Sequence, residues 1–302
     1  MRGNNLTIIG GTGGMGQVFA KYFKQHGIEI TIHDRDEKKL KNIAKNLGVN
    51  YELELEKSVE NADFIMISIP IHSTPEMIEK IAPYMKKNST IFDITSVKQE
   101  TYKTLDRMCK KYPINCLSLH PMFGPGIKNF DKYTLIVLKV GGTEYYDEIV
   151  EELLDIFKSD GLLLTETTYD THDKYIALTL GLPHMLNILF LTLLKKTSKS
   201  LTELTNYTGT SFLLQKVFAE SIIQREMEMF GEIQMKNQEF YQILDTFESI
   251  IVEYKKIIKK KDIIRFNKIF NECLEYSKED IHFNNSYYYF YEFMKILKEK
   301  EI

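Results

Sequence analysis

Short apolar runs and longer amphipathic segments alternate along the first half of the chain. The short runs are rich in Ile, Val, Phe and Thr, which favour strands, and the segments between them repeat apolar residues at the helical spacing. The predicted strands are residues 6–10, 29–33, 64–70, 89–94, 115–120 and 134–138. Strands that alternate with helices in this way predict a parallel, doubly wound sheet.

The pattern changes after about Thr165. No further strand is predicted, and long stretches such as residues 213–234 and 240–270 carry apolar positions at the helical spacing without a proline. We therefore predict two domains, one over residues 1–165 and an all-α domain over residues 166–302. The predicted fold class is α/β, with a doubly wound parallel sheet of Rossmann type followed by helices.

One uncharged stretch, residues 176–194, approaches the length of a membrane span. Pro183, His184 and Asn187 interrupt it, and it is the single segment of its kind, so we predict a buried helix and no membrane role. Residues 1–11 become glycine-rich too early for the apolar core of a signal peptide, which leads us to expect a cytoplasmic protein.

Composition narrows the class of partner. The formal net charge of the 302 residues is −3, and Lys and Arg are spread along the chain. This distribution favours a small-molecule substrate over nucleic acid or an anionic membrane. The three cysteines, Cys109, Cys116 and Cys273, form no CxxC pair, so we expect reduced thiols without redox or zinc chemistry.

A glycine-rich motif follows the first predicted strand and opens the first helix. In dinucleotide-binding folds the GxGxxG pattern allows a tight turn, brings backbone N–H groups to a pyrophosphate and lets the helix lie close to the sheet. We predict cofactor contacts from Gly11, Thr12, Gly13, Gly14, Met15 and Gly16. A tight turn without a ligand is the alternative. The strand and helix around the motif favour the cofactor, so residues 1–165 are predicted to bind a dinucleotide.

Charged residues after the second predicted strand bear on the choice of cofactor. Asp34 lies 23 residues after Gly11, where a carboxylate accepts hydrogen bonds from both hydroxyls of an adenosine ribose and repels a 2′-phosphate. This favours NAD, although the neighbouring Arg35 could pair with that phosphate and leaves NADP open. Ser68 and Pro70, which end a later strand, are predicted to wall the nicotinamide side; an ordinary strand end is the alternative.

His120 is the main candidate for proton transfer. It ends strand 115–120 at the carboxyl edge of the predicted sheet, where ligands of open α/β folds bind. Removing a hydride from an alcohol carbon requires a group that takes the hydroxyl proton, and neutral histidine does this near pH 7. Gly124, in the turn that follows, leaves room for cofactor and substrate. A structural histidine before Pro121 is the alternative.

Several motifs together resemble one enzyme family. The sequences GGTGGMG, TSVK, HPMFGP, HD and GLPHM, which begin at residues 10, 95, 120, 172 and 181, are similar to the prephenate dehydrogenase family in its archaeal-like form. The resemblance covers nearly the whole chain. It implies an oxidoreductase of tyrosine biosynthesis, in which hydride passes from carbon 4 of prephenate to NAD, carbon dioxide leaves and 4-hydroxyphenylpyruvate forms. Helical domains of such dehydrogenases commonly form homodimers, so residues 166–302 are expected to bind substrate and to dimerise.

The resemblance also implies roles for three residues. His120 is the base that accepts the proton of the 4-hydroxyl, and Ser96 orients His120 and touches cofactor or substrate. His184 reaches from the helical domain toward the substrate; the alternative is a satisfied histidine beside a helix kink made by Pro183.

Three further polar residues receive structural interpretations. His172 and Asp173 could form a metal site with His184, but their spacing matches no usual zinc pattern, so we interpret them as a pair at the start of a helix. Lys98 could attract an anionic substrate, but a solvated lysine in the first turn of a helix is the simpler interpretation. We therefore predict no metal and leave these residues out of the site.

The resemblance fails at the expected carboxylate clamp. Arginine is implied at two positions that are Leu213 and Ser221 in this chain. If residues 221–229 are helical, Arg225 lies one turn beyond Ser221 and is our candidate for binding a substrate carboxylate; a surface arginine is the alternative.

Three functions therefore remain open. The leading prediction is a prephenate dehydrogenase, with arogenate or another hydroxylated carboxylic acid as the alternative substrate. A non-catalytic NAD-binding sensor or partner module is the alternative of another class, because the clamp is missing while His120, Ser96 and His184 are present.

Overall fold

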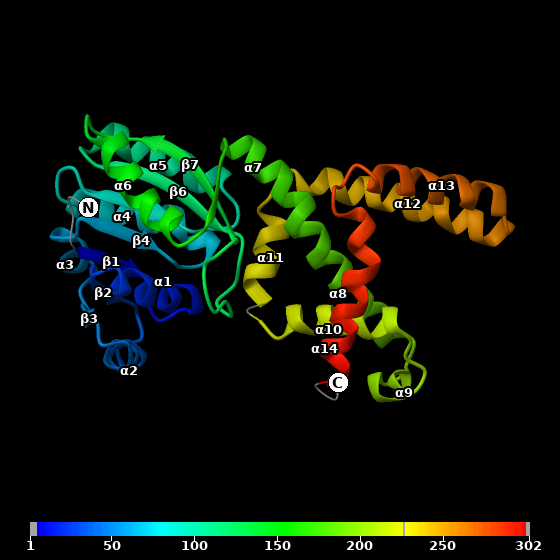
Figure 1. Cartoon of the computed structure of the whole chain (residues 1–302). Coiled ribbons are helices and arrows are strands. Elements are labelled where there is room, and N and C mark those ends of the chain that lie inside the picture. The colour runs from blue at the N-terminus through cyan, green and yellow to red at the C-terminus, as the bar shows by residue number, and fades with distance from the viewer. Residues whose placement is uncertain (1–4, 226, 300–302) are drawn as a thin grey trace. The chain divides into compact units, whose positions relative to one another are not determined.

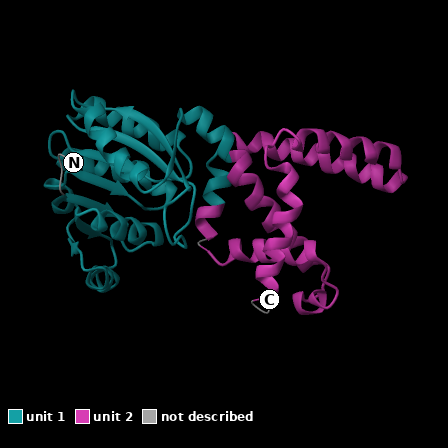
Figure 2. Cartoon of the chain, in the orientation of Figure 1, with its two compact units in different colours: residues 1–176, 231–238 teal, residues 177–230, 239–302 magenta. Residues whose placement is uncertain are grey.

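A computed structural model describes residues 5–225 and 227–299. Contacts between Cα atoms divide the chain into two compact units (Figure 2). The first comprises the chain up to Ile176 together with Gly231–Gln238, and the second comprises Ala177–Phe230 and the chain from Glu239 onward. These units are defined by contacts alone, and the division into domains at residue 165 stays a prediction.

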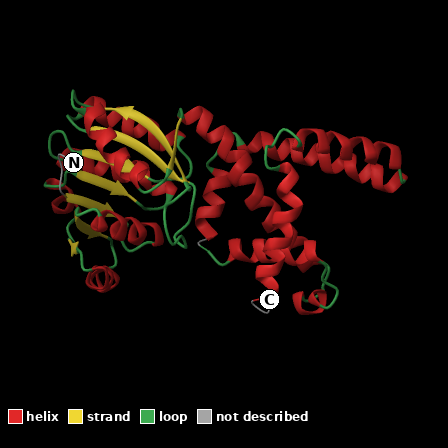
Figure 3. Cartoon of the chain, viewed as in Figure 1, coloured by secondary structure: helices red, strands yellow, loops and turns green. Residues whose placement is uncertain are grey.

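An eight-stranded sheet forms the centre of the first unit, in the order β3-β2-β1-β4-β5-β6-β7-β8 (Figures 1 and 3). Every neighbouring pair is parallel except β6 and β7. The strands are β1 (Asn5–Ile9), β2 (Glu29–His33), β3 (Asn50–Tyr51), β4 (Phe64–Ile67), β5 (Thr90–Asp93), β6 (Asn115–Pro121), β7 (Thr134–Gly141) and β8 (Leu163–Glu166). The predicted doubly wound α/β fold is confirmed; the short strands β3 and β8 were not predicted.

Helices cover both faces of this sheet, and each face has its own apolar core. One core joins the sheet to α1, α2 and α6 through residues such as Phe19, Leu40 and Phe157, and the other joins it to α3, α4 and α5. The helices are α1 (Gly14–Gln25), α2 (Glu37–Leu47), α3 (Leu55–Glu60), α4 (Thr74–Ile81), α5 (Gln99–Lys111), α6 (Tyr146–Ser159) and α7 (Tyr169–Ile176). This layering places the carboxyl ends of the parallel strands at one edge, where loops can form a site.

Among the described residues of the second unit, all regular secondary structure is helical. It contains α8 (Leu182–Lys196), α9 (Leu201–Thr205), α10 (Thr210–Ile223), α12 (Phe240–Lys260), α13 (Ile263–Ser277) and α14 (Ser286–Glu299) (Figure 1). Helix α11 (Met227–Met235) starts in this unit, but its residues from Gly231 onward belong to the first unit. The predicted all-α second half is confirmed.

The apolar stretch around α8 is more exposed than predicted. A π-helical turn, Ala177–Gly181, joins α7 to α8 just before Pro183, whose missing N–H cannot complete an ordinary helical ladder. The helix from Tyr169 to Lys196 is long and apolar enough to cross a membrane, and 28% of its most apolar part is buried. One such helix is weak evidence for a span. The expected burial is therefore wrong for the single chain, which leaves several leucines of α8 exposed.

Candidate active site

The turn between β1 and α1 requires glycine at two points. Gly10 has a φ of +82°, and a Cβ there would lie 2.2 Å from the carbonyl oxygen of Ser68 on the neighbouring chain segment. A Cβ at Gly16 would lie 2.4 Å from the carbonyl oxygen of Gly10. The backbone is therefore folded too tightly for any side chain at these positions, as the predicted dinucleotide turn demands. Gly10 was not among the predicted cofactor residues, although it directly precedes them.

The start of α1 offers unpaired backbone donors. The first backbone hydrogen bond of the helix runs from the N–H of Gln17 to the carbonyl oxygen of Gly13 at 3.0 Å, so the N–H groups of residues 14–16 have no acceptor within the helix. No acidic side chain stands in this first turn. These donors and the helix dipole suit the negative charge of a pyrophosphate.

Asp34 follows β2 beside this turn. Its Oδ2 accepts a hydrogen bond of 2.5 Å from the Thr12 hydroxyl, and its Oδ1 accepts one of 2.8 Å from the Arg35 N–H. The Asp34 side chain is half-buried, whereas Arg35 is exposed. The carboxylate is therefore held by the glycine-rich turn itself, and its contact with a ribose stays a prediction.

The loop after β4 is held by α11. Glu232 accepts hydrogen bonds from the N–H groups of Ile71 (2.9 Å) and His72 (3.2 Å), and it also contacts the His72 ring. Ser68 N donates to Ile9 O at 2.8 Å, which ties the same loop to β1. The segment with Ser68 and Pro70 thus lies next to the glycine-rich turn, with Pro70 exposed and Ser68 half-buried.

His120 lies at the end of β6 and is 3% exposed. Its Nδ1 is 2.9 Å from Nε2 of His172, and Nδ1 of His172 is 2.7 Å from Oδ1 of Asp173. Burial lowers the pKa of His120 well below its usual value, and the nearby His172 and Lys98 lower it further. Burial also lowers the pKa of His172, against the effect of its bond to Asp173. Both rings are therefore neutral near pH 7.

Asp173 is the most firmly held member of this cluster. Its carboxylate accepts hydrogen bonds from the backbone N–H groups of Lys98 (3.0 Å) and Gln99 (3.0 Å), at the start of α5. Its carbonyl oxygen accepts one of 2.8 Å from the side chain of Asn237, which is fully buried in the segment after α11. Placing His172 and Asp173 outside the site was a prediction that this geometry contradicts, because His172 contacts His120 directly and Asp173 holds His172.

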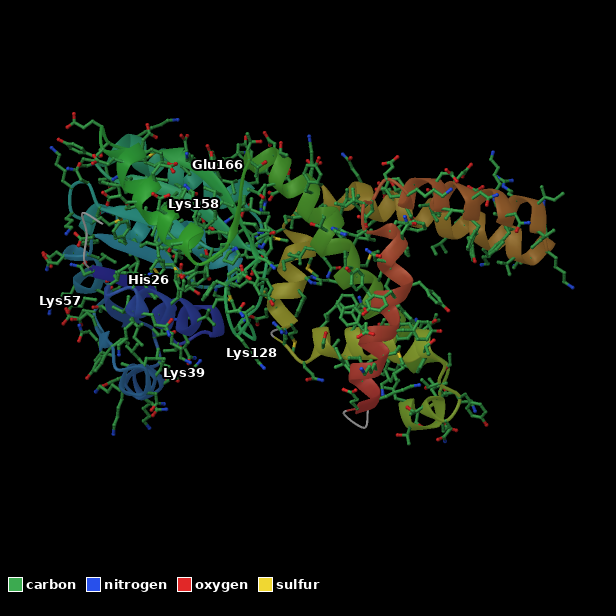
Figure 4. The ribbon with its side chains drawn as sticks, in the orientation of Figure 1. His26, Lys39, Lys57, Lys128, Lys158 and Glu166 are labelled. Carbon is green, nitrogen blue, oxygen red and sulfur yellow. The ribbon has the colours of Figure 1, made fainter. Side chains whose placement is uncertain are left out.

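Lys98 is also buried, and its interpretation as a solvated lysine is wrong. The side chain is 0% exposed, and its Nζ donates to Oδ2 of Asp93 at 2.7 Å and to the carbonyl oxygen of Leu119 at 2.6 Å. Burial lowers the pKa of Lys98, and Asp93 opposes that shift. The surface charges labelled in Figure 4, such as Lys39 and Lys57, extend outward from the ribbon instead.

Ser96 and Gly124 lie on loops of the same unit. Ser96 follows β5 and is half-buried; in the described chain its hydroxyl makes no hydrogen bond to His120, whose Nδ1 is taken by His172. Gly124 is half-buried in the turn after β6. The next residue, Pro125, packs against Gly14 so closely that a Cβ on Gly14 would lie 3.0 Å from the Pro125 ring. The HPMFGP segment therefore contacts the glycine-rich turn.

His184 lies in the first turns of α8, in the second unit. Its Nδ1 is buried without a hydrogen-bond partner among the described residues, and its ring meets the Phe230 ring edge-on at 4.6 Å. Burial lowers the pKa of His184 to about 4, so the ring is neutral near pH 7. A buried unsatisfied nitrogen is costly, which argues against the satisfied structural histidine.

The structure contradicts the reasoning for Arg225. Helix α10 ends at Ile223 and α11 begins at Met227, so residues 221–229 do not form one helix and the predicted shared face with Ser221 does not exist. Arg225 is exposed, and the Ser221 hydroxyl donates to the carbonyl of Phe218 at 2.7 Å. We find no basis in this geometry for a carboxylate clamp at Arg225.

The described residues hold no group of three or more His, Cys, Asp or Glu side chains that could bind a metal ion. The functional groups of the first unit are thus a dinucleotide turn and a histidine cluster at the carboxyl edge of the sheet. Together they define a nucleotide-binding protein of the dehydrogenase class with a Rossmann-type sheet.

Two family models place the chain more narrowly. The prephenate dehydrogenase nucleotide-binding domain matches residues 19–136, and the prephenate dehydrogenase dimerization domain matches residues 168–272. The chain belongs to the prephenate dehydrogenase family.

Known proteins similar to the chain agree. A probable arogenate/prephenate dehydrogenase of Methanocaldococcus jannaschii is 28% identical over 91% of the chain, and the T-protein of Haemophilus influenzae is 26% identical over 91%. The matches cover 62% and 69% of those proteins, so the chain spans about two thirds of their length. The crystal structure of prephenate dehydrogenase from Aquifex aeolicus with hydroxyphenyl propionate and NAD⁺ superposes with a TM-score of 0.75 at 19% identity, covering 92% of this chain and 98% of that one.

Proposed function

We propose that this protein oxidises prephenate to 4-hydroxyphenylpyruvate with NAD, with His120 as the base. The observation that carries the proposal is the state of His120, a neutral histidine at the carboxyl edge of the sheet whose Nδ1 is occupied and whose Nε2 has no partner in the described chain. Such a nitrogen accepts a proton from a substrate hydroxyl.

The reaction balances with one proton that His120 holds temporarily. Bound NAD would supply the acceptor for the hydride that leaves carbon 4 of the ring. His120 accepts the proton of the 4-hydroxyl, the bond between the ring and its carboxylate breaks to release carbon dioxide, and the phenolic oxygen takes the proton back. Aromatisation makes the step favourable, and the protein supplies position and a proton acceptor.

The residues of the glycine-rich turn fit a dinucleotide. The N–H groups of residues 14–16 suit the pyrophosphate, and Asp34 suits the two hydroxyls of the adenosine ribose. Ser68 and Pro70 are proposed to border the nicotinamide. We favour NAD over NADP because the half-buried Asp34 would meet a 2′-phosphate as a like charge, while the exposed Arg35 is free to turn either way.

Two features of the chain bear on the choice of substrate. His184 has an unsatisfied buried nitrogen suited to a polar substrate group. Gly124, which has no side chain to fill the turn after β6, is proposed as a further substrate contact. Arg225 is exposed, and Leu213 and Ser221 carry no charge, so none of these positions offers a clamp for a substrate carboxylate. Arogenate and other hydroxylated carboxylic acids are therefore to be tested as substrates beside prephenate. The related protein of Methanocaldococcus jannaschii is itself described as a probable arogenate/prephenate dehydrogenase.

We also propose a homodimer through the helical unit. Many large apolar side chains of α12, α13 and α14 are exposed in the single chain, including Ile264, Phe270 and Tyr287, which are 82%, 63% and 75% exposed. Patches of this kind mark protein contacts. Sedimentation or light scattering should give twice the mass of one chain; a monomer at micromolar concentration would contradict the proposal.

A single assay tests the activity. The purified protein is mixed with NAD or NADP and with prephenate or arogenate, and the absorbance of the reduced cofactor is followed; the same is done with His120→Asn. We expect turnover with NAD and at least one substrate, and a loss of about 10²-fold or more in His120→Asn. Intact NAD binding without turnover of either substrate would instead favour the non-catalytic sensor.

A further inference from the structure

We propose that Asp173 and His172 are positioning residues that set the tautomer of His120, so that its Nε2 carries the lone pair. A chain of two hydrogen bonds runs from the carboxylate of Asp173 through both nitrogens of His172 to Nδ1 of His120, over 2.7 Å and 2.9 Å. The orientation of the tautomers follows from the two distances and from what each atom can donate or accept. The final step, proton transfer from a substrate hydroxyl, rests on the proposed function.

The direction of the chain is set at Asp173. Its carboxylate accepts hydrogen bonds from the N–H groups of Lys98 and Gln99, so it faces the start of α5, where the helix dipole favours a negative charge. An ionised carboxylate only accepts, so Nδ1 of His172 must donate to it. In a neutral imidazole the other nitrogen is then an acceptor, and Nε2 of His172 must accept.

The same logic continues to His120. Because Nε2 of His172 accepts, the hydrogen between the two rings belongs to Nδ1 of His120. Nε2 of the neutral His120 ring is therefore unprotonated and available as a base. Without this chain the two tautomers of a histidine are close in energy, and the protonated Nε2 form cannot accept a proton.

The charges around the pair suit a proton that is held briefly. Three charged groups lie near the two histidine rings: Asp173 from α7, Lys98 from the start of α5 and Asp93 from β5. Lys98 and Asp93 form a buried pair that compensates its own charge, which leaves Asp173 as the surplus negative charge. Asp173 thus stabilises a cationic histidine pair, whereas Lys98 and burial favour return of the proton.

Two further contacts keep the chain in place. Asn237, fully buried, donates to the carbonyl of Asp173, and Lys98 Nζ donates to the carbonyl of Leu119, the residue before His120. The Asp173 end and the His120 end of the hydrogen-bond chain are therefore each held by a separate contact.

The tautomer can be measured without substrate. Nuclear magnetic resonance of isotope-labelled histidine nitrogens distinguishes a protonated from an unprotonated ring nitrogen. We expect the His120 signal, assigned by its loss in His120→Asn, to show a protonated Nδ1 and an unprotonated Nε2. The opposite tautomer would overturn the proposal, whether or not the protein turns over prephenate.

Asp173→Asn provides the kinetic test. The Asn oxygen should stay with the two N–H groups of α5, which turns its NH₂ toward His172 and reverses both tautomers. We expect kcat to fall by about 10²- to 10⁴-fold, as when a catalytic histidine is left in the wrong tautomer, while the Kd of NAD stays within about threefold. The acid limb of the pH profile of kcat should move to lower pH, because a negative charge that favours the cationic histidines is gone.

A matched control separates this role from general damage. His26 and Asp160 form another histidine–carboxylate pair at 2.7 Å, on the surface of the first unit, so Asp160→Asn should leave kcat unchanged. If Asp173→Asn fails to fold, His172→Gln and His172→Leu replace it. Glutamine offers a donor and an acceptor on one group and should retain at least about tenfold more activity than leucine. Equal activity in these two variants, or an active Asp173→Asn, would overturn the proposal; an inactive wild type would refute only the proposed function.

Discussion

Replacing Lys98 with methionine should destabilise the protein strongly. The substitution keeps most of the volume of the side chain but removes Nζ, which donates to Asp93 at 2.7 Å and to the carbonyl of Leu119 at 2.6 Å. Both members of the ion pair are 0% exposed, so no water replaces the lost donor. Asp93 is left as a buried carboxylate without its cation.

The size of the effect follows from what remains. Removing one partner of a buried pair costs about 3–5 kcal/mol in general. Asp93 still accepts hydrogen bonds from the Ser118 hydroxyl and from the N–H and hydroxyl of Thr95, which reduces the penalty. We therefore expect Lys98→Met to lower the free energy of unfolding by about 3 kcal/mol, the lower end of that range.

Denaturant titration, monitored by circular dichroism, measures this loss. Asp93→Asn in the Lys98→Met background should recover part of it, because the uncompensated charge is then removed. Lys110→Met is the control, since Lys110 and Asp106 also form a pair at 2.7 Å but their side chains are 72% and 36% exposed. The reasoning fails if Lys98→Met costs no more than Lys110→Met, or if the double variant is less stable than the single one.

Three other predictions concern acid, the glycine-rich turn and the cofactor. Burial lowers the pKa values of His120, His172 and His184, so in acid the unfolded chain binds protons that the folded chain does not. The free energy of unfolding should therefore fall as the pH drops below about 6.5, the usual pKa of histidine. A free energy of unfolding that stays constant down to pH 5 would contradict this. Gly16→Ala should weaken NAD binding by at least about tenfold in calorimetry, whereas Gly209→Ala, where a Cβ meets nothing within 4 Å, should not. Asp34→Ser should raise the affinity for NADP relative to NAD, and an unchanged ratio of Kd values would remove Asp34 from cofactor selection.

The sheet could be predicted because its signals are local. Each strand other than β3 and β8 is an apolar run between turn residues, and the glycine-rich turn is defined by six consecutive residues. Strand β3 has two residues and β8 is largely exposed, so neither carries an apolar pattern of its own. Their pairing is decided by neighbouring strands, which a local pattern does not contain.

The histidine cluster depended on contacts that no local pattern shows. Lys98 stands at the start of a helix, where lysine is normally solvated, and becomes buried because Asp93 ends the preceding strand beside it. His172 and Asp173 resemble the ordinary start of a helix until β6 brings His120 within 2.9 Å. Arg225 failed for a local reason, since the helix assumed over residues 221–229 is interrupted after Ile223.

The assignment of Gly231–Gln238 to the first unit has a consequence for how the chain can be divided. The polypeptide passes between the units after Ile176, after Phe230 and again after Gln238. A single cut at any of these connections leaves parts of one unit on both fragments, so non-covalent contacts within that unit should keep the fragments together. A fragment that begins at Ala177 would carry Glu232 and Asn237 without their partners, and a fragment that stops at Ile176 would lack the buried amide that holds Asp173. Each unit is thus compact in its own contacts, but neither corresponds to one continuous piece of the chain.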